Sequence, residues 1–539
     1  MAAIESTVHR TSEDFKKNRL AMEALLDRVR KIENDTRQAS ESSGPKFAAR
    51  GQLLPTERVG LLLDHDSDFL ELATLAGYGY KPLDRHGREV AGGGLIAGIG
   101  TISGTRCMIC ASDSGIEAGA FQPMGLEKLL RIQEIALENK LPFVQLIESG
   151  GGNLMNYKVE NFVIGGEKYR NLARLSAAGI PVITVAHGSA TAGGAYQIGL
   201  SDYVIMVDGH AKAFLAGPAL LKAATGEEAS EEELGGARMH CSTSGLGDYL
   251  AHDDRDAIRI AREVIALLDW EKDTAATGTA PAPRYSAEDL MGIMPIDNNR
   301  AVDMREIIAR IVDDSDFHDF ASQYGRDTIC GKARIDNIAV GIITNNGPID
   351  PAGAAKAAHF IQACCQSGTP LLYLNNTTGF MVGRSYEQSG SITHGSMMIQ
   401  AVSNASVPQI TLFCGASFGA GHYAMCGRAF SPRFCFSWPN ARCAVMGSEQ
   451  AANTMEMVAR AKSARSNKPV DEEKLSEQRE KIIHNFEKQA DVFATSARLL
   501  DDGVIDPRDT RAVLAKALHI CLDAQTRTTH PLSFSVPHP

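Results

Sequence analysis

The chain has 539 residues, of which 44% are hydrophobic and 22% are charged, and its formal net charge is -11. These values are typical of a folded protein with about two or three hydrophobic cores and argue against a disordered or fibrous chain. The negative charge argues against nucleic acid as a main partner, and no apolar run is long enough to span a membrane.

Residues 1–48 predict a helical segment that precedes the main domains. Apolar residues recur at helical spacing between Asp14 and Asp35, which indicates an amphipathic helix. The N-terminus lacks the apolar core of a secretory signal and the Arg-rich character of a transit peptide, so we expect a cytoplasmic protein. Eleven cysteines, set mostly in apolar runs, agree with free thiols in a reducing compartment.

The central part of the chain is an internal duplication. PVITVAHGSATAGGAY begins at Pro181, PQITLFCGASFGAGHY begins at Pro408, and six of their sixteen positions are identical. LPFVQLIESGGGNL precedes the first copy and TPLLYLNNTTGFMVG the second, so that Pro142 lies 39 residues before Pro181 and Pro370 lies 38 before Pro408. Helical segments and further strand runs come before both. The chain therefore predicts two related halves built from strands and helices.

Composition sets the expected boundaries between these halves. The segment TAATGTAPAP, residues 274–283, is small and Pro-bearing, as exposed linkers are. We expect an N-terminal domain over residues 49–283 and a C-terminal domain over residues 284–510. Residues 511–539 predict a final helix and a tail, THPLSFSVPHP, that we expect to be loose.

Each duplicated stretch predicts a buried strand that breaks at small residues, where a helix opens with unpaired N–H groups. A ligand oxygen can approach this backbone closely where no Cβ intervenes, and the helix dipole adds partial positive charge. One interpretation is a site that stabilises an oxyanion. The other is a tight packing turn without a ligand, which is the better interpretation of either copy alone. The presence of two copies favours the oxyanion sites.

Several segments carry a resemblance to one family. They are ARGQLLPTERVGLLLD, AGGGLIAGIGTISG, GSATAGGAYQIGLSDYVIM and GPALLKAATGEEAS in the first half, and ACCQ, LNNTTGFMVGRSYE, HGSMM and GASFGAGHYAMCGRAFSPRFCFSWPNARCAVMGSEQAAN in the second. From about Ala49 onward the chain resembles the carboxyltransferase (beta) subunit of biotin-dependent acyl-CoA carboxylases, above all the 3-methylcrotonyl-CoA and geranyl-CoA types. The resemblance implies an α/β fold with two tandem crotonase-like (ClpP/crotonase) ββα-superhelix domains. The first would bind the acyl-CoA and the second the carboxybiotin.

The resemblance also implies the reaction, a transfer of CO2 from carboxybiotin to the enolate of a branched or unsaturated acyl-CoA. It needs two oxyanion holes and no basic side chain, in a site that the family forms between the first half of one subunit and the second half of another. By analogy, Gly193 and Gly194 form the enolate hole, and Gly421 with His422 forms the biotin hole. The internal alignment pairs Gly193 with Ala420 and Gly194 with Gly421. Ala420 is therefore also a biotin-side candidate, and the second hole could be displaced by one position.

Other candidates have equally good structural explanations. Ser149, Gly150 and Gly151 follow a strand and could line the acyl pocket or form an ordinary turn. Lys128 and Arg131 could hold CoA phosphates or lie on a solvated helical face. Lys222 and Glu227 could border the substrate channel or begin a surface helix. The C-x-x-C pair, Cys107 and Cys110, lies in a strand pattern where positions three apart face opposite sides, so we expect no metal site there.

The chain departs from the branched-chain pattern in two places. His422 stands where those members usually carry Asn, and the first-half segment MNYKVENFVIGGEKYRN replaces a stretch that resembles FPDRDHFGR. Both places could shape the acyl pocket, so propionyl-like, geranyl-like and other acyl groups remain open. Whether His422 titrates during turnover is open as well.

What the sequence lacks points to a partner. It has neither a glycine-rich ATP-binding signature nor an A-M-K-M-type biotin attachment sequence. We therefore expect an alpha subunit with biotin carboxylase and biotin carrier domains, and ATP and bicarbonate would be used only by that partner. The resemblance implies a homo-hexamer of this chain within a larger hetero-oligomer.

Three rival functions remain open. A carboxyltransferase subunit of a decarboxylase that drives a sodium pump would have a membrane partner. An enoyl-CoA hydratase or isomerase would need catalytic carboxylates near the first glycine turn, and the sequence from Gly188 onward has none before Asp202. A scaffold that has lost its chemistry would not be expected to keep both glycine turns.

Overall fold

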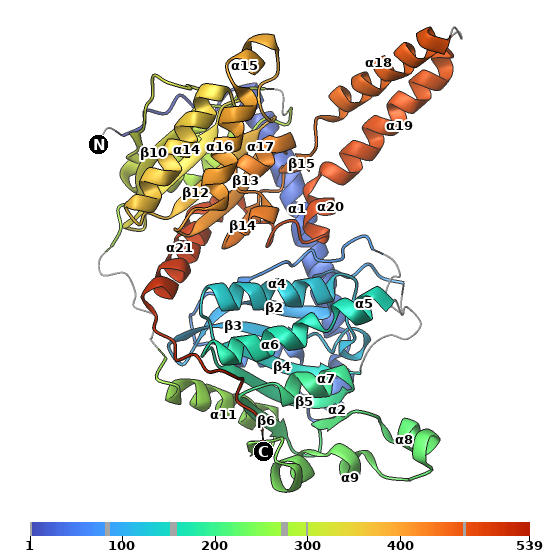
Figure 1. Cartoon of the computed structure of the whole chain (residues 1–539). Helices are drawn as coiled ribbons and strands as arrows, with labels where there is room; N and C mark the ends of the chain where they lie inside the picture. Colours follow the sequence, from blue (N-terminus) through green and yellow to red (C-terminus); the bar gives the residue numbers. More distant parts are fainter. Residues whose placement is uncertain are drawn as a thin grey trace. The chain divides into compact units, whose positions relative to one another are not determined.

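The structure is a computed structural model that describes residues 3–80, 87–150, 159–270, 279–297, 300–466 and 470–538. The chain divides into two compact units (Figure 1). The first-half unit comprises residues 30–275, 497–499 and 522–539, and the second-half unit comprises residues 1–29, 276–496 and 500–521. Each unit is built around one mixed sheet.

The sheet of the first-half unit has the strand order β1-β2-β3-β4-β5-β6-β8, and β7 also pairs with β5. Strands β1, β2 and β3 are antiparallel neighbours, and the pairs from β3 onward are parallel. The strands are β1 (Leu70–Glu71), β2 (Leu95–Ile102), β3 (Thr105–Ser112), β4 (Phe143–Ser149), β5 (Val182–Thr191), β6 (Tyr203–Val207), β7 (Lys212–Phe214) and β8 (Tyr249–Ala251).

Helices of the first half of the chain cover this sheet. Figure 1 shows α4 and α6 side by side along the sheet, and α11 packs against α3 and against β5, β6 and β8. The helices are α1 (Glu13–Glu41), α2 (Gly44–Ala49), α3 (Pro55–Leu62), α4 (Gly125–Glu138), α5 (Val159–Ile164), α6 (Glu167–Ala177), α7 (Gly193–Gly199), α8 (Pro218–Thr225), α9 (Glu231–Gly235), α10 (Ala237–Met239) and α11 (Asp254–Leu267). Because both faces are covered, β3, β4 and β5 consist almost entirely of buried residues.

The second-half unit repeats this plan. Its sheet has the order β14-β13-β12-β11-β10-β9, and β15 also pairs with β13. Its strands are β9 (His318–Asp319), β10 (Thr328–Ile335), β11 (Ile338–Asn345), β12 (Leu371–Thr377), β13 (Gln409–Phe418), β14 (Phe434–Ser437) and β15 (Arg442–Ala444). The remaining helices are α12 (Leu290–Ile293), α13 (Arg305–Ile311), α14 (Pro351–Gln366), α15 (Arg384–Gln388), α16 (Ser391–Ser403), α17 (Gly419–Ala424), α18 (Ser448–Ser466), α19 (Glu472–Ala490), α20 (Val492–Ala497) and α21 (Thr510–Thr526).

The two sheets match in detail, as the duplication predicts. In the first sheet the β4/β5 register shifts between Ile147 and Ser149, and in the second the β12/β13 register shifts between Asn375 and Thr377. A short extra strand, β7 or β15, then pairs with the end of β5 or β13 in the same way. The two sheets therefore share the same irregularity at equivalent places. The expected α/β fold with two crotonase-like halves is confirmed.

The C-terminal tail differs from the expectation. It is not loose, because its backbone bonds to the body of the first-half unit: Leu532 N donates to Ala177 O at 2.7 Å, and Val536 N donates to Ser176 Oγ at 3.0 Å. The short, Pro-bearing sequence of the tail gave no sign of these partners, which lie more than 350 residues away in sequence.

The cysteines are all free. Cys107 and Cys110 both lie in β3 and are buried, and burial raises the pKa of the Cys110 thiol to about 12. None of the helices in the described part of the chain is long and apolar enough to cross a membrane.

Candidate active site

The first glycine turn joins β5 to α7. Ala192, the residue between them, has φ = 52°, and a positive φ is uncommon for a residue with a Cβ. Its amide donates to Phe214 O at 3.0 Å and so fixes the turn against β7. The next two amides, those of Gly193 and Gly194, open the helix and by position have no acceptor within it. The turn therefore presents two N–H groups at a helix start, where the dipole favours negative charge.

One of the residues predicted to line the acyl pocket, Ser149, lies beside this turn. A Cβ on Gly194 would lie 3.3 Å from Ala190 Cβ and 3.9 Å from Ser149 Cβ, so the structure brings Ser149 and Gly194 together. Gly150 follows, and its amide donates to Ala118 O at 2.9 Å. Gly151 lies outside the described residues. The end of β4 thus forms one wall of the first glycine turn.

The second glycine turn joins β13, which is buried throughout, to α17. Gly419 has φ = 56° at this junction. A Cβ on Gly421 would lie 2.9 Å from Gly379 Cα and 3.0 Å from Thr377 Cγ2. Because backbone approaches backbone here, glycine is required at position 421.

The two turns can be aligned residue by residue. Ala192 and Gly419 occupy equivalent positions in the duplication, and both have a positive φ, of 52° and 56°. Counting onward from them pairs Gly193 with Ala420 and Gly194 with Gly421. This equivalence favours the amides of Ala420 and Gly421 over that of His422 as the second donor pair.

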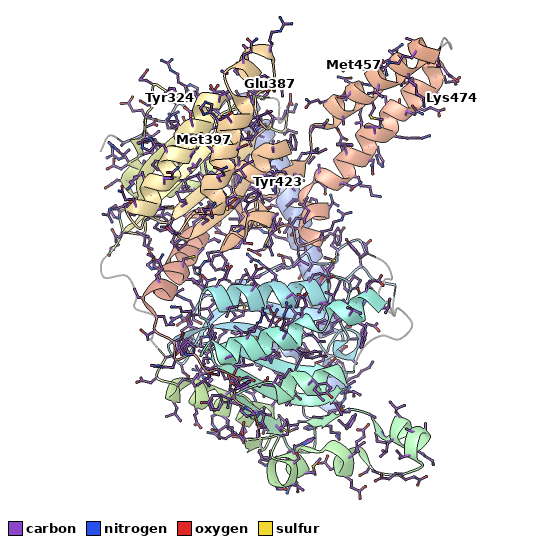
Figure 2. All side chains as sticks on the ribbon, viewed as in Figure 1. Tyr324, Glu387, Met397, Tyr423, Met457 and Lys474 are labelled. Carbon is purple, nitrogen blue, oxygen red and sulfur yellow. The ribbon has the colours of Figure 1, made fainter. Side chains whose placement is uncertain are left out.

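The side chain of His422 is held inside the second-half unit. Its ring stacks on Phe413 with centroids 5.4 Å apart, and its Nδ1 lies 2.9 Å from Ser417 Oγ and 3.5 Å from Cys443 Sγ. Burial lowers the pKa of His422 from 6.5 to about 4. At neutral pH the imidazole of His422 is therefore uncharged. The neighbouring Tyr423 is half exposed on α17 (Figure 2).

Replacing His422 with Asn is expected to leave the shape of the pH–activity profile unchanged between about pH 6 and pH 9, because the imidazole does not titrate there. Its folded-state pKa is depressed, so the stability that this group contributes is complete above pH 6.5 and is lost as pH falls towards 4. Activity of both proteins with a saturating partner, measured across this range, checks the prediction. A single ionisation that disappears in His422→Asn would contradict it.

Lys128 and Arg131 do not offer their charges at the surface. Lys128 is fully buried, and its ammonium donates to Leu95 O at 2.8 Å and to Gly92 O at 3.2 Å. Burial lowers its pKa to about 8. Arg131 is buried as well and pairs with Glu134 at 2.8 Å. Because both side chains serve contacts inside the fold, we do not retain them as ligands of CoA phosphates.

The other weak pair, Lys222 and Glu227, is exposed at the end of α8, and Lys222 pairs with Glu228. This geometry agrees with the surface-helix interpretation. Within the described ranges no group of three or more His, Cys, Asp or Glu side chains is arranged to hold a metal ion.

A buried charge cluster that the sequence did not reveal supports the first glycine turn. Arg58 pairs with Glu148 at 2.7 Å and with Asp254 at 3.0 Å, and His187 Nδ1 lies 2.6 Å from Asp254. Burial raises the pKa of Asp254, but the hydrogen bond and charge of His187 and the charge of Arg58 lower it to about 2. Glu148 directly precedes Ser149, so the cluster fixes the end of β4 beside the turn. In the sequence, Glu148 is visible only as the one charged residue of the strand FVQLIES, and nothing near it indicates its partners.

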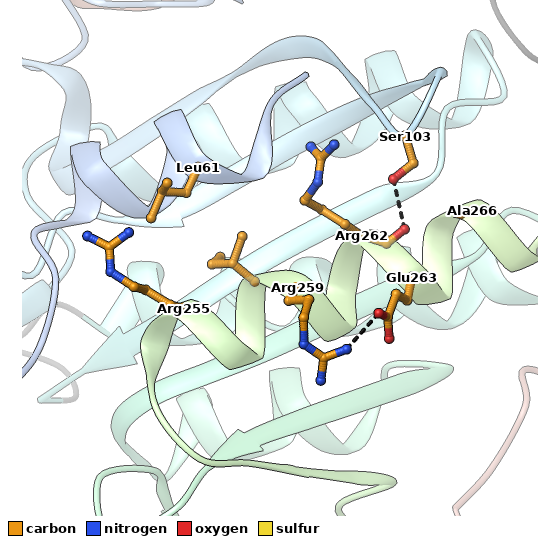
Figure 3. A pocket seen from close by; sticks show the side chains of 8 residues that line it. Leu61, Ser103, Arg255, Arg259, Arg262, Glu263 and Ala266 are labelled. Carbon is orange, nitrogen blue, oxygen red and sulfur yellow. Dashed lines mark hydrogen bonds and ion pairs between the residues drawn. The ribbon is translucent and has the colours of Figure 1, made fainter. Parts of the chain in front are cut away.

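A pocket of about 440 Å³ lies elsewhere in the first-half unit (Figure 3). It is lined by α11, by Leu61 and by Ser103, which sits in the turn between β2 and β3. Strands β3, β4 and β5 run parallel to one another. Ser103 lies just before β3 begins, whereas the glycine turn lies just after β5 ends. The pocket is therefore at the opposite end of these strands from the candidate active site.

Comparisons with known proteins agree with this geometry. The model of the carboxyl transferase domain family matches residues 46–533. The chain is 43% identical over 527 residues to the mitochondrial methylcrotonoyl-CoA carboxylase beta chain of Dictyostelium discoideum, covering 96% of this chain and 88% of that one. It is 43% identical over 491 residues to the biotin-dependent 3-methylcrotonyl-coenzyme A carboxylase beta1 subunit of Mycobacterium tuberculosis, covering 90% and 91%. The solved structure of the geranyl-CoA carboxylase beta subunit of P. aeruginosa is 49% identical and superimposes with a TM-score of 0.93 over 100% of both chains.

Two crotonase-like halves, each with a glycine turn at a helix start, and a family match over most of the chain place this protein in the carboxyl transferase domain family. Within that family it is a carboxyltransferase (beta) subunit of the biotin-dependent acyl-CoA carboxylases. The resemblance identified from the sequence is thereby confirmed.

Proposed function

We propose that this chain transfers CO2 from carboxybiotin, carried by a partner chain, to the enolate of a branched or unsaturated acyl-CoA of the 3-methylcrotonyl-CoA or geranyl-CoA type. The observation that carries the proposal is the pair of equivalent glycine turns, each of which opens a helix with free N–H groups. The names of the relatives support the acyl class, since they act on methylcrotonyl-CoA or geranyl-CoA.

The first turn would act on the acyl-CoA. The amides of Gly193 and Gly194 bind the thioester oxygen and stabilise the negative charge that it gains when the substrate loses a proton. Ser149 and Gly150, at the end of β4, form the neighbouring wall. No basic side chain of this chain is needed, because the proton leaves to the biotin.

The second turn would act on the biotin. There is no room for a Cβ at position 421, because Gly379 Cα would lie 2.9 Å from it and Thr377 Cγ2 3.0 Å from it. Bound carboxybiotin supplies CO2 and then a basic nitrogen. The amides bind the ureido oxygen, and His422 stays neutral beside them and shapes the pocket by stacking on Phe413.

The assembly that this function requires includes an alpha subunit with biotin carboxylase and biotin carrier domains, which alone uses ATP and bicarbonate. We further propose that this chain forms a homo-hexamer in that complex and acts in the cytoplasm. The free cysteines agree with a reducing compartment.

The experiment is ATP-dependent fixation of labelled bicarbonate by this chain with its biotinylated partner, across acyl-CoAs from acetyl to geranyl. Incorporation into methylcrotonyl-CoA or geranyl-CoA is expected. Incorporation into propionyl-CoA or acetyl-CoA instead would show that the substrate is not of the branched or unsaturated class. Failure with every acyl-CoA, while the partner carboxylates free biotin, would favour the decarboxylase alternative.

A further inference from the structure

Lys168 has an unusual environment in the first turn of α6. Its ammonium lies 4.8 Å from the ring centroid of Phe121 and 4.9 Å from that of Tyr169, and the side chain is half-buried. It belongs to the segment in which this chain departs from the branched-chain pattern. Cation–π contact with two rings holds the ammonium in one place instead of letting it extend into water.

That place is beside the first glycine turn. A Cβ on Gly193 would lie 2.3 Å from Tyr169 Oη and 3.7 Å from Lys168 Nζ. The ring of Tyr169 in turn meets Tyr196 of α7 edge to face, with centroids 6.1 Å apart. The start of α6 therefore covers the start of α7, and it places a positive charge within a few ångströms of the amide of Gly193.

Among the described residues no carboxylate pairs with the ammonium of Lys168, and no acceptor of a hydrogen bond from it is found there. Its main-chain carbonyl accepts a hydrogen bond from the Gln133 side chain at 3.1 Å. The groups that face it are Phe121, Tyr169 and the glycine turn, and burial alone lowers its pKa to about 8. Lys128 has the same lowered pKa, but its ammonium donates to two carbonyls. A partly desolvated ammonium without an anion is stabilised when an anion arrives.

We propose that Lys168 is a further catalytic residue on the acyl-CoA side, whose ammonium stabilises the negative charge that develops on the thioester oxygen held by Gly193 and Gly194. The inference rests on the proposed function. During turnover Lys168 neither gains nor loses a proton, because the proton that the substrate loses goes to the biotin nitrogen. It adds a full positive charge to two neutral donors at the point where charge appears in the transition state.

The test compares Lys168→Met, which keeps the stem on the rings but removes the charge, with Lys168→Arg, which keeps a charge at all accessible pH values. We expect Lys168→Met to lower kcat about 10²-fold and to change the KM for acyl-CoA much less. Since the ammonium loses its proton as pH rises through about 8, the activity ratio of Lys168→Arg to the unaltered enzyme should rise above that pH. Taking a ratio removes any pH dependence of the partner.

Lys140→Met is the matched control, since Lys140 is a half-buried lysine of the same unit whose ammonium donates to Arg527 O at 2.6 Å, and it should keep normal kinetics. An unaltered enzyme that fixes no CO2 would refute the proposed function itself. An active enzyme in which Lys168→Met has normal kcat would overturn the role of Lys168 alone. A raised KM with normal kcat would also overturn it, because the ammonium would then serve ground-state binding.

Discussion

Replacing Gly194 with valine is expected to abolish carboxylation. The new Cβ would lie 3.3 Å from Ala190 Cβ and 3.9 Å from Ser149 Cβ, and the two further methyl groups would crowd the space between the end of β4 and the helix start. The helix start must then tilt, and both amides leave the positions from which they stabilise the enolate. Loss of one such donor costs about 10²- to 10³-fold in kcat, so loss of both should bring turnover below detection. Labelled-bicarbonate fixation with a saturating partner measures the effect.

Two further variants make this result interpretable. Gly60→Val is the matched control, because Gly60 lies in α3, is exposed, and has nothing within 4 Å of an added Cβ. Gly194→Ala adds only the Cβ, and Ala190 must move by only a few tenths of an ångström to admit it. We therefore expect the activity of Gly194→Ala to stay within about tenfold of normal. The elution volume of the oligomer should be unchanged in all three. Normal turnover by Gly194→Val would refute the assignment of the first hole.

Local signals in the sequence predicted the parts of this fold that depend on neighbouring residues. The repeated strand, glycine turn and helix start predicted both β5/α7 and β13/α17, because apolar runs and glycines act over a few residues. The docked tail was missed, since Leu532 bonds to Ala177 across the chain and its own sequence is that of a loop. Contacts between residues so far apart in the sequence leave no pattern in the sequence around either residue.

The same distinction explains which contacts near the candidate site the sequence could not predict. Lys128 follows GAFQPMGLE at the start of a helix, so it was interpreted as a candidate for CoA phosphates or as part of a solvated face. Its ammonium instead bonds to the carbonyls of Gly92 and Leu95, at a turn that closes only in the folded chain. Arg58, Glu148 and Asp254 likewise meet only after folding, because 196 residues separate the first from the last. Lys168 was not singled out in the sequence. It lies in the segment MNYKVENFVIGGEKYRN, which departs from the pattern of the branched-chain carboxylases.

Replacing Gly421 with alanine is expected to be far more damaging than Gly194→Ala. The added Cβ would lie 2.9 Å from Gly379 Cα and 3.0 Å from Thr377 Cγ2, distances that require the main chain itself to move. The end of β12 cannot move freely, because the hydroxyl of Thr377 bonds to Gly347 O and to Gly379 O. The helix start must therefore shift, and the amides of Ala420 and Gly421 shift with it. We expect kcat to fall about 10²- to 10³-fold.

This loss should be confined to the biotin side of the reaction. Equilibrium binding of acyl-CoA should be unchanged in Gly421→Ala, because the amides proposed to hold the thioester belong to Gly193 and Gly194. Gly347→Ala is the control in the same unit, since nothing lies within 4 Å of a Cβ there. Gel filtration and circular dichroism establish that both variants fold. If Gly421→Ala turned over normally, the second glycine turn would not hold the biotin; if it instead lost acyl-CoA affinity with normal kcat, the two turns would have to exchange roles.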